Sequence, residues 1–293
     1  MISILRKIYR RYIHWPRLDK FIYAILDFLT DIYSYLRGYS FPKNYIRRWK
    51  LDMLWELYEK ETCLLFKKII KPDMVIVDLG AHIGYFTKLF SKLVGKNGVV
   101  YAFEADPENF QILQRNVKNL RNVRIYQMAI TDHAGMIDFY HCEEKAGCHS
   151  ILPNVPLNFK MRKITVPASD LETILLKEGV TKFDMIKMDI EGGESAAING
   201  MENILKQNHD MSIVVEFAPD WITTAGNNPL NFLKKLASFG FTIFAIRTNQ
   251  LVKLNPNDPK SYEKFLVKEP NATDSYNNFI NLYCTKTASE VTS

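Results

Sequence analysis

The amino-acid sequence predicts an α/β fold in which helices cover both faces of a mostly parallel sheet. From residue 51 onward, short runs rich in Val and Ile alternate with helix-periodic runs, which is the pattern of repeated strand–helix units. Several strand runs are continuously apolar, as expected for strands buried on both faces. The chain has 293 residues, 47% hydrophobic and 24% charged, so it can form one large folded domain.

The elements of this core follow one another along residues 51–286. A helix-periodic run over 51–70 precedes the first strand. We expect strands at 74–79, 98–104, 122–130, 163–168, 183–190, 211–217, 241–248 and 278–285, and a turn followed by an extra strand within 131–141. We expect helices at 84–95, 107–120 with Pro107 at the first position, 169–179 capped by Ser169 or Asp170, 194–207 and 229–240. Residues 287–293 are expected to form a disordered tail.

Residues 1–50 differ from this core in charge. They hold eleven Lys and Arg against three Asp, a balance of +8, so the rest of a chain with net charge +6 sums to −2. A basic arm on a nearly neutral body indicates contact with an anionic surface at the arm, and we expect no nucleic-acid partner for the whole chain. Four cysteines without a CxxC pair, and no signal-peptide pattern at the start, favour a reducing compartment, so we expect a cytoplasmic protein.

The segment 21–36 is predicted to be an amphipathic helix. Asp27, Thr30, Asp31 and Ser34 recur at helical spacing and form one narrow polar stripe on an otherwise apolar segment. The segment is shorter than the roughly 20 apolar residues that cross a bilayer. Two alternatives are open: packing on the main domain, or peripheral membrane contact in which lipid headgroups meet the basic residues Arg6, Lys7, Arg10, Arg11 and Arg37. The acidic stripe favours packing, because interfacial helices usually carry Lys and Arg there.

The strongest local motif is the turn "VDLGAHIG" between the first strand and its helix. Gly80 and Gly84 allow a sharp turn and close approach of a ligand, and the new helix offers free N–H groups to an anion. Positions 80, 82 and 85 read Gly, His and Tyr, which departs from the dinucleotide fingerprint and argues against NAD. Asp78 suits a ligand with positive charge, such as the ammonium and sulfonium of S-adenosylmethionine. Glu104, at the end of the second strand, is placed to accept hydrogen bonds from ribose hydroxyls.

Acidic side chains gather at the ends of two later strands. The stretch "IKMDIEGGE" places Asp189, Glu191 and Glu194 after one strand, and Glu216 ends another. Ligands of open α/β sheets bind at this edge, so these carboxylates are candidates for catalysis or substrate binding. Such a cluster is costly unless it holds a cation, shares a proton or binds hydroxyl groups. For Glu191 and Glu194 the alternative is that they stabilise the start of the next helix.

The stretch "HCEEKAGCHS" sets one His–Cys pair at residues 141–142 and another at 148–149. Neighbouring residues of an extended strand point to opposite faces, and the two cysteines are more widely spaced than in structural zinc sites. We therefore expect neither a metal site nor a disulfide, and we expect the two pairs to act separately.

These motifs resemble the FkbM family of S-adenosylmethionine-dependent methyltransferases. The resemblance runs from about Tyr58 to about Cys284 and rests most specifically on "IKMDIEGGESAAINGM", with "VIVDLGAHIGYFT", "VYAFEADPENF" and "MAITDHAG" beside it. It implies a Rossmann-like class I methyltransferase fold with a mostly parallel seven-stranded sheet. It also implies S-adenosylmethionine as the cofactor, bound by the predicted set Asp78, Gly80, Ala81, His82, Gly84, Glu104, Ala105 and Ala129. Family members usually have Asn in place of His82.

The resemblance further implies methyl transfer to a hydroxyl, often that of a sugar or natural product. Such a reaction needs alignment and a general base, for which Asp189 is the first candidate. Glu191 or Glu194 would then orient the other hydroxyls of a small-molecule or glycan acceptor. "GCHSIL" falls where family members have a segment near the acceptor, so His149 and Ser150 are predicted to touch substrate and His149 is a rival base. Two other classes stay open: a scaffold that has lost catalysis, and a nucleic-acid methyltransferase.

Overall fold

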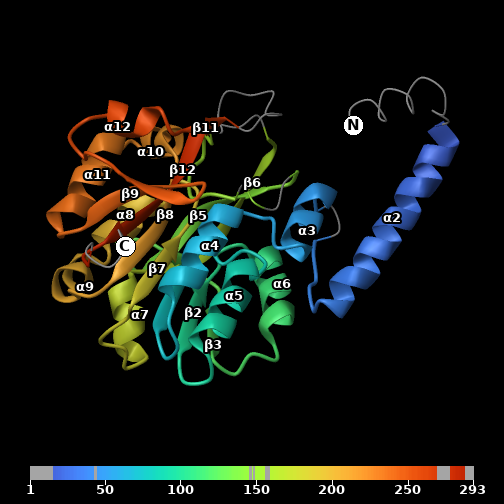
Figure 1. Cartoon of the computed structure of the whole chain (residues 1–293), viewed down its shortest axis with the longest axis horizontal. Coiled ribbons are helices and arrows are strands. Elements are labelled where there is room, and N and C mark those ends of the chain that lie inside the picture. Colours follow the sequence, from blue (N-terminus) through green and yellow to red (C-terminus); the bar gives the residue numbers. More distant parts are fainter. Residues whose placement is uncertain are drawn as a thin grey trace.

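The computed structural model describes residues 16–42, 45–144, 147, 149–155, 159–268 and 278–287. A central twisted sheet forms the body, a small second sheet lies at one end of it, and an N-terminal helix extends outward (Figure 1). Most of the predicted tail and the basic residues before Pro16 lie outside the described residues.

The central sheet has the strand order β10-β9-β12-β8-β7-β1-β2-β3. Neighbours from β3 to β8 are parallel, and β12 is antiparallel to both β8 and β9. Among the described residues the sheet has nine strands, because β10 forms a hairpin with β9 and β11 pairs with β12, beyond the seven predicted. The strands are β1 Val75–Leu79, β2 Val99–Phe103, β3 Val123–Tyr126, β7 Met185–Met188, β8 Ser212–Phe217, β9 Thr242–Arg247, β10 Gln250–Lys253, β11 Val267–Lys268 and β12 Asn278–Thr285.

Helices cover both faces of this sheet. Successive strand residues point to opposite faces, so Ile76 packs in one core and Val77 in the other. The first core includes α4 Lys60–Ile69, α5 Tyr85–Val94 and α6 Pro107–Val117. The second includes α7 Leu171–Lys177, α8 Glu194–Asn199, α9 Glu202–Gln207, α10 Pro219–Thr224, α11 Pro229–Ser238 and α12 Lys260–Glu263.

Local chemistry sets several helix boundaries. Asp170, rather than Ser169, caps α7, because its carboxylate accepts a hydrogen bond from the backbone N–H of Thr173 at 2.7 Å. The single helix predicted over 194–207 is instead two short helices, α8 and α9, that meet at Gly200. A Cβ at Gly200 would lie 2.0 Å from the carbonyl oxygen of Thr131, so the chain passes too close to another backbone for a side chain there.

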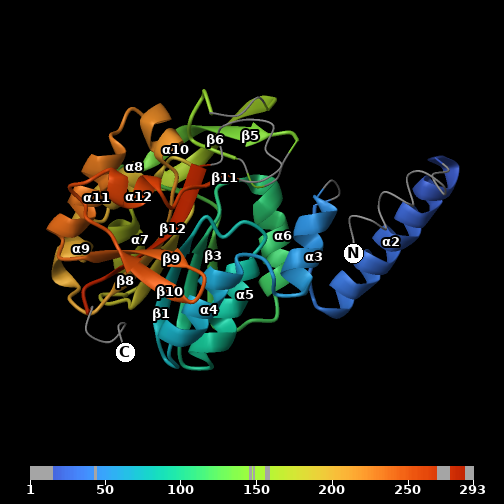
Figure 2. The same cartoon turned by 45° about the horizontal axis from the view of Figure 1, so that its top comes forward.

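The second sheet has the order β4-β6-β5, with β4 Ala129–Ile130, β5 Gly135–Cys142 and β6 Met161–Ser169. Its strands β5 and β6 lie at the top of the molecule in Figure 2, beside one end of the central sheet. The strand predicted over 122–130 is therefore two strands: β3 pairs with β2, and β4 leaves the central sheet to pair with β6. This departure brings the end of β5, and with it His141 and His149, over the edge of the central sheet.

The N-terminal helix α2, Pro16–Leu36, does not pack on the sheet domain, so the favoured alternative from the sequence is wrong. Its main contacts with another described element are those with the short helix α3, Arg47–Leu54, and it points away from the body (Figures 1 and 2). Within the described part of the chain, no helix combines the length and apolar character needed to cross a membrane.

Candidate functional site

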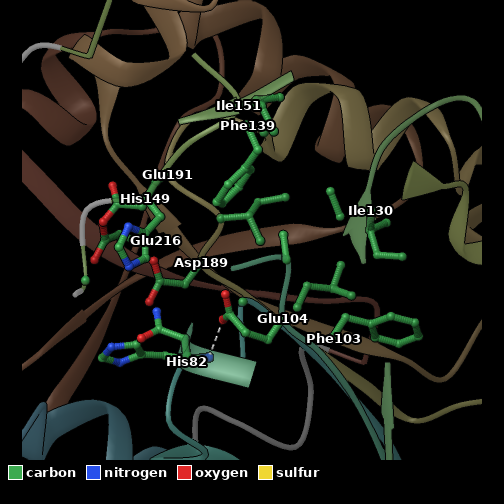
Figure 3. Close-up of a pocket in the computed structure, with 18 of the residues that line it drawn as sticks. His82, Phe103, Glu104, Ile130, Phe139, His149, Ile151, Asp189, Glu191 and Glu216 are labelled. Carbon is green, nitrogen blue, oxygen red and sulfur yellow. Dashed lines mark hydrogen bonds between the residues drawn. The ribbon is translucent and has the colours of Figure 1, made fainter. Parts of the chain in front are cut away.

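A pocket opens at the carboxyl ends of β1, β2, β7 and β8 and beneath the second sheet. Asp189, Glu191, Glu216 and His149 gather on one side of it, Glu104 lies in the middle, and apolar side chains such as Phe139, Ile151 and Ile130 form the other side (Figure 3). Of the predicted cofactor residues, those that line the pocket are Gly80, His82, Glu104, Ala105 and Ala129.

The other three predicted cofactor residues, Asp78, Ala81 and Gly84, do not line the pocket. Asp78 is fully buried and its Oδ2 accepts a hydrogen bond from the Thr87 hydroxyl at 2.6 Å. This bond links β1 to α5 and so stabilises the turn between them. Gly84 is the residue before α5, with φ +88°, and a Cβ there would lie 2.8 Å from Leu113 Cδ1. Gly84 therefore permits α5 and α6 to pack closely.

Gly80 is the glycine that the pocket itself requires. Its φ is +76°, which side chains rarely adopt, and a Cβ there would lie only 1.8 Å from the carbonyl oxygen of Asp189. The turn after β1 thus lies directly against the end of β7. This contact brings the predicted cofactor turn and the predicted catalytic residue together.

Glu104 is held in place by backbone donors on both of its oxygens. Oε2 accepts from the N–H of His82 at 2.7 Å, drawn in Figure 3, and Oε1 accepts from the N–H of Asp106 at 2.8 Å. The side chain is buried, and burial raises the pKa of Glu104 to about 8 despite these donors. A fixed carboxylate with remaining lone pairs toward the pocket suits hydroxyl donors.

His82 takes a backbone conformation that explains its residue type. Its φ is +52°, in the left-handed region where Asn and His are enriched among residues with side chains. A His is therefore well suited to this position. Its ring lies 5.6 Å from that of Tyr45, and its buried Nε2 has no hydrogen-bond partner among the described residues. Burial lowers the pKa of His82 to about 4, so the ring is neutral.

Three carboxylates meet on one side of the pocket (Figure 3). Asp189, Glu191 and Glu216 each contribute an oxygen, and these oxygens all lie within 4.8 Å of one another. Burial, followed by the charge of Asp189, raises the pKa values of Glu191 and Glu216 well above their ordinary range. This set can share protons, bind hydroxyl groups or hold a cation.

Lys187 supplies the positive charge that this cluster needs. Its buried amino group donates to Asp189 Oδ2 and to the Gly80 carbonyl oxygen, both at 3.2 Å, and lies 3.9 Å from Asp78 Oδ1. Glu59, which the sequence analysis did not single out, adds a further carboxylate nearby. Burial raises the pKa of Glu59 to about 7, and Asn281 donates to it at 2.7 Å.

Glu194 does not line the pocket. Its buried carboxylate accepts hydrogen bonds from the N–H groups of Ile190 at 3.2 Å and Gly192 at 3.0 Å. It therefore shapes the turn between β7 and α8, which is the structural alternative that the sequence left open for it. Glu191, by contrast, reaches the pocket from that turn with φ +49°.

His149 lines the pocket, but its hydrogen bonding argues against the role of general base. The N–H of Cys142 donates to His149 Nδ1 at 2.9 Å, so Nδ1 carries a lone pair and Nε2 carries the proton. Burial lowers the pKa of His149 to about 4. The ring thus presents an N–H donor, and its basic nitrogen is already occupied. Ser150 is fully buried and donates to the Glu191 carbonyl oxygen at 2.6 Å, outside the pocket lining.

The expectation that the two His–Cys pairs act separately is wrong for the histidines. The rings of His141 and His149 stack at 4.5 Å, because a bridge between Tyr140 and Ser150 folds the loop back onto β5. His141 Nδ1 lies 2.5 Å from Oδ2 of Asp106, the cap of α6. These three residues have metal-ligand spacing, but the proton on His149 Nε2 leaves that nitrogen unable to bind a metal. Cys142 is a free thiol, and Cys148 lies outside the described residues.

An aromatic wall completes the pocket, and sequence reasoning missed it. Tyr45, Trp49 and Tyr58 all line the pocket, although the first two lie in the N-terminal extension. Trp49 also packs near Gly147, at 3.5 Å from the position of a Cβ there. The extension is therefore part of the site.

Comparison with known proteins identifies the family. The model of the methyltransferase FkbM domain matches residues 78–243, more than half of the chain. The chain belongs to the FkbM methyltransferase family. The predicted class, an S-adenosylmethionine-dependent methyltransferase domain of Rossmann-like α/β fold, is confirmed.

One curated relative is the 2-O-methyltransferase NoeI of Sinorhizobium fredii (strain NBRC 101917 / NGR234). It is 29% identical over 147 residues, which cover 46% of this chain and 60% of the relative. The match thus spans less than two thirds of the relative's length.

Among solved structures, the chain is similar to a precorrin-6y C5,15-methyltransferase from Geobacter metallireducens, with 14% identity, a TM-score of 0.43 and coverage of 85% of this chain and 96% of that one. It is also similar to Aeropyrum pernix fibrillarin with bound S-adenosyl-L-methionine, with 13% identity, a TM-score of 0.43 and coverage of 77% and 74%.

Proposed function

We propose that the protein transfers a methyl group from S-adenosylmethionine to a hydroxyl of a sugar, in a glycan, a lipid-linked glycan or a related natural product. The observation that carries this proposal is that the cluster of Asp189, Glu191 and Glu216 lines the same pocket as the aromatic side chains Tyr45, Trp49 and Tyr58. The name of the relative NoeI, a 2-O-methyltransferase, supports transfer to oxygen.

The cofactor side of the pocket fits S-adenosylmethionine. Glu104 would accept hydrogen bonds from the ribose hydroxyls, because its carboxylate is already fixed by two backbone donors. Gly80 and His82 would contact the methionine part of the cofactor. Ala105 and Ala129 line the same pocket as the apolar side chains Phe139, Ile151 and Ile130. Asp78 would act indirectly, by holding the turn. The cofactor supplies an activated methyl group on a sulfonium, so the protein has to align an acceptor and remove its proton.

The acceptor side fits a polyhydroxyl ligand. Asp189 is the proposed base: its side chain is 26% exposed, and Lys187 holds one of its oxygens while the other has no hydrogen bond from any described residue. Glu191 and Glu216, with raised pKa values, can both donate to and accept from neighbouring hydroxyls. Tyr45 and Trp49 offer flat apolar surfaces to the C–H face of a sugar ring.

The test compares Asp189→Asn with Asp138→Asn, a control on an exposed position of β5 outside the pocket lining. Methyl transfer is measured against a panel of oligosaccharides and glycolipids, and cofactor affinity is measured by calorimetry. We expect Asp189→Asn to lose roughly 10²- to 10⁴-fold in turnover, the contribution of a general base, while cofactor affinity changes little. An Asp189→Asn enzyme with unchanged turnover would refute the base assignment.

A further inference from the structure

Helix α2 exposes most of its apolar side chains and buries part of its polar stripe. Thr30 and Ser34 of its polar stripe are buried against the protein, whereas its large apolar side chains face outward. Phe21, Phe28 and Leu36 are 63%, 65% and 74% exposed. The other exposed apolar residues of the helix are Ile22, Tyr23, Ile25, Leu26, Leu29, Ile32, Tyr33 and Tyr35. A contiguous apolar surface of this kind marks an interaction site.

The polar stripe is satisfied without any external partner. Arg47 on α3 forms two hydrogen bonds to Asp27, at 2.5 and 2.6 Å, and Lys50 donates to Asp31 at 3.2 Å. The hydroxyls of Thr30 and Ser34 bond to carbonyl oxygens one turn back in the same helix, each at 2.7 Å. The two acidic residues that argued against membrane contact are therefore neutralised by the protein's own cations.

The sheet domain anchors the chain just after the end of α2. The amide of Asn116 exchanges two hydrogen bonds with the backbone of Ser40, and Lys88 donates to the carbonyl oxygen of Gly38 at 2.6 Å. From this attachment α2 projects outward with its apolar surface clear of the domain (Figures 1 and 2). The apolar surface of α2 is therefore accessible to a binding partner or a membrane outside the described part of the chain.

We propose that α2 binds in the interface of an anionic lipid bilayer, lying on the membrane without crossing it. Residues 1–50 carry eleven Lys and Arg against three Asp, and two of those three Asp are already ion-paired within the protein. An apolar helix flanked by excess positive charge matches anionic headgroups over an acyl layer. A second copy of the chain fits less well, because it would bring two +8 segments together.

The test is co-flotation of the full chain with two kinds of vesicle. One consists of phosphatidylcholine alone, and the other contains about 30 mol% phosphatidylglycerol, which gives the membrane surface a negative potential. The variant is Phe21→Ser, Phe28→Ser and Leu36→Ser combined; these side chains are exposed, so the fold should tolerate the changes. The matched control is Leu64→Ser, Met136→Ser and Leu176→Ser, three exposed apolar residues on the domain.

We expect binding to anionic vesicles that weakens with salt, a loss of about tenfold or more in partitioning for the α2 variant, and little change for the control. Equal flotation of the α2 variant and wild type, or no flotation with anionic vesicles, would overturn the proposal. So would a dimer in sedimentation analysis that the α2 variant abolishes, because a second copy would then cover the helix. Cofactor affinity, measured in parallel, reports on the proposed function independently.

Discussion

Replacing Glu104 with Gln should weaken cofactor binding and also change its pH dependence. Both oxygens of Glu104 accept backbone N–H groups, at 2.7 and 2.8 Å, so the amide nitrogen of Gln must face one of these donors. The variant therefore loses an acceptor where the ribose is expected to bind. A hydrogen bond to a charged group contributes about 1.5–3 kcal/mol, which corresponds to a loss of roughly 10- to 150-fold in affinity.

The pH dependence makes this prediction specific. The pKa of Glu104 is raised to about 8 by burial, so below that pH the empty site must lose a proton when ribose hydroxyls bind the carboxylate. Wild-type affinity should rise about tenfold for each pH unit as the pH approaches 8, and the Gln variant should lack this rise. Calorimetric titration from pH 6.5 to 8.5 measures both effects. Glu108→Gln, on an exposed side chain of α6, is the control. Equal affinities and equal pH profiles for Glu104→Gln and wild type would refute the assignment.

Three further outcomes follow from the geometry. Gly80→Ala places a Cβ 1.8 Å from a backbone oxygen, so it should prevent folding or abolish cofactor binding. Gly95→Ala is the control: its φ of +72° and ψ of −162° favour Gly, but the space around it is open, so the change should cost about 1–3 kcal/mol in denaturant unfolding and leave cofactor binding intact. Equal effects of the two changes would contradict the close contact at Gly80. The pKa values of Glu59, Glu194 and Glu104 are raised in the folded protein to about 7, 7 and 8, so the folded state binds protons that the unfolded chain has released. The free energy of unfolding should therefore fall from pH 6.5 to 8.5, by about 2 kcal/mol from Glu104 alone. A melting temperature that stays level or rises over this range would count against these pKa values. Nitrogen-15 spectra should show the His149 proton on Nε2 between pH 6 and 9, and a proton on Nδ1 would restore His149 as a candidate base.

The core of the fold could be predicted from the sequence because each buried strand or helix has a recognisable pattern of apolar residues within its own segment. The continuous Val and Ile run at 75–77 indicated a buried strand, which is β1, and β12 begins and ends where its residue pattern indicated. The positions of Gly80, Glu104, Asp189 and Glu216 along one sheet edge followed from strand order, since parallel strands end on the same side.

What the sequence did not predict depends on contacts between distant segments. The orientation of α2 is set by Arg47 and Lys50, about twenty residues further along the chain, and periodicity alone does not say which face is covered. The pairing of His141 with His149 depends on a bridge across the loop. The role of Glu194 depends on a tight turn whose backbone donors point at it. Trp49 reaches the pocket from a segment that the family motifs do not include.

The most direct test of the proposed function is isotope tracing in cells fed methionine with a trideuterated methyl group. Glycans and glycolipids from cells with the wild-type gene, the Asp189→Asn gene and no gene are compared by mass spectrometry, with fragmentation to locate the label. Methyl transfer to a sugar hydroxyl predicts a trideuteromethyl group on a carbohydrate oxygen in the wild-type cells only. Label that depends on the gene but resides in nucleic acid, protein or a nitrogen atom would contradict sugar O-methylation.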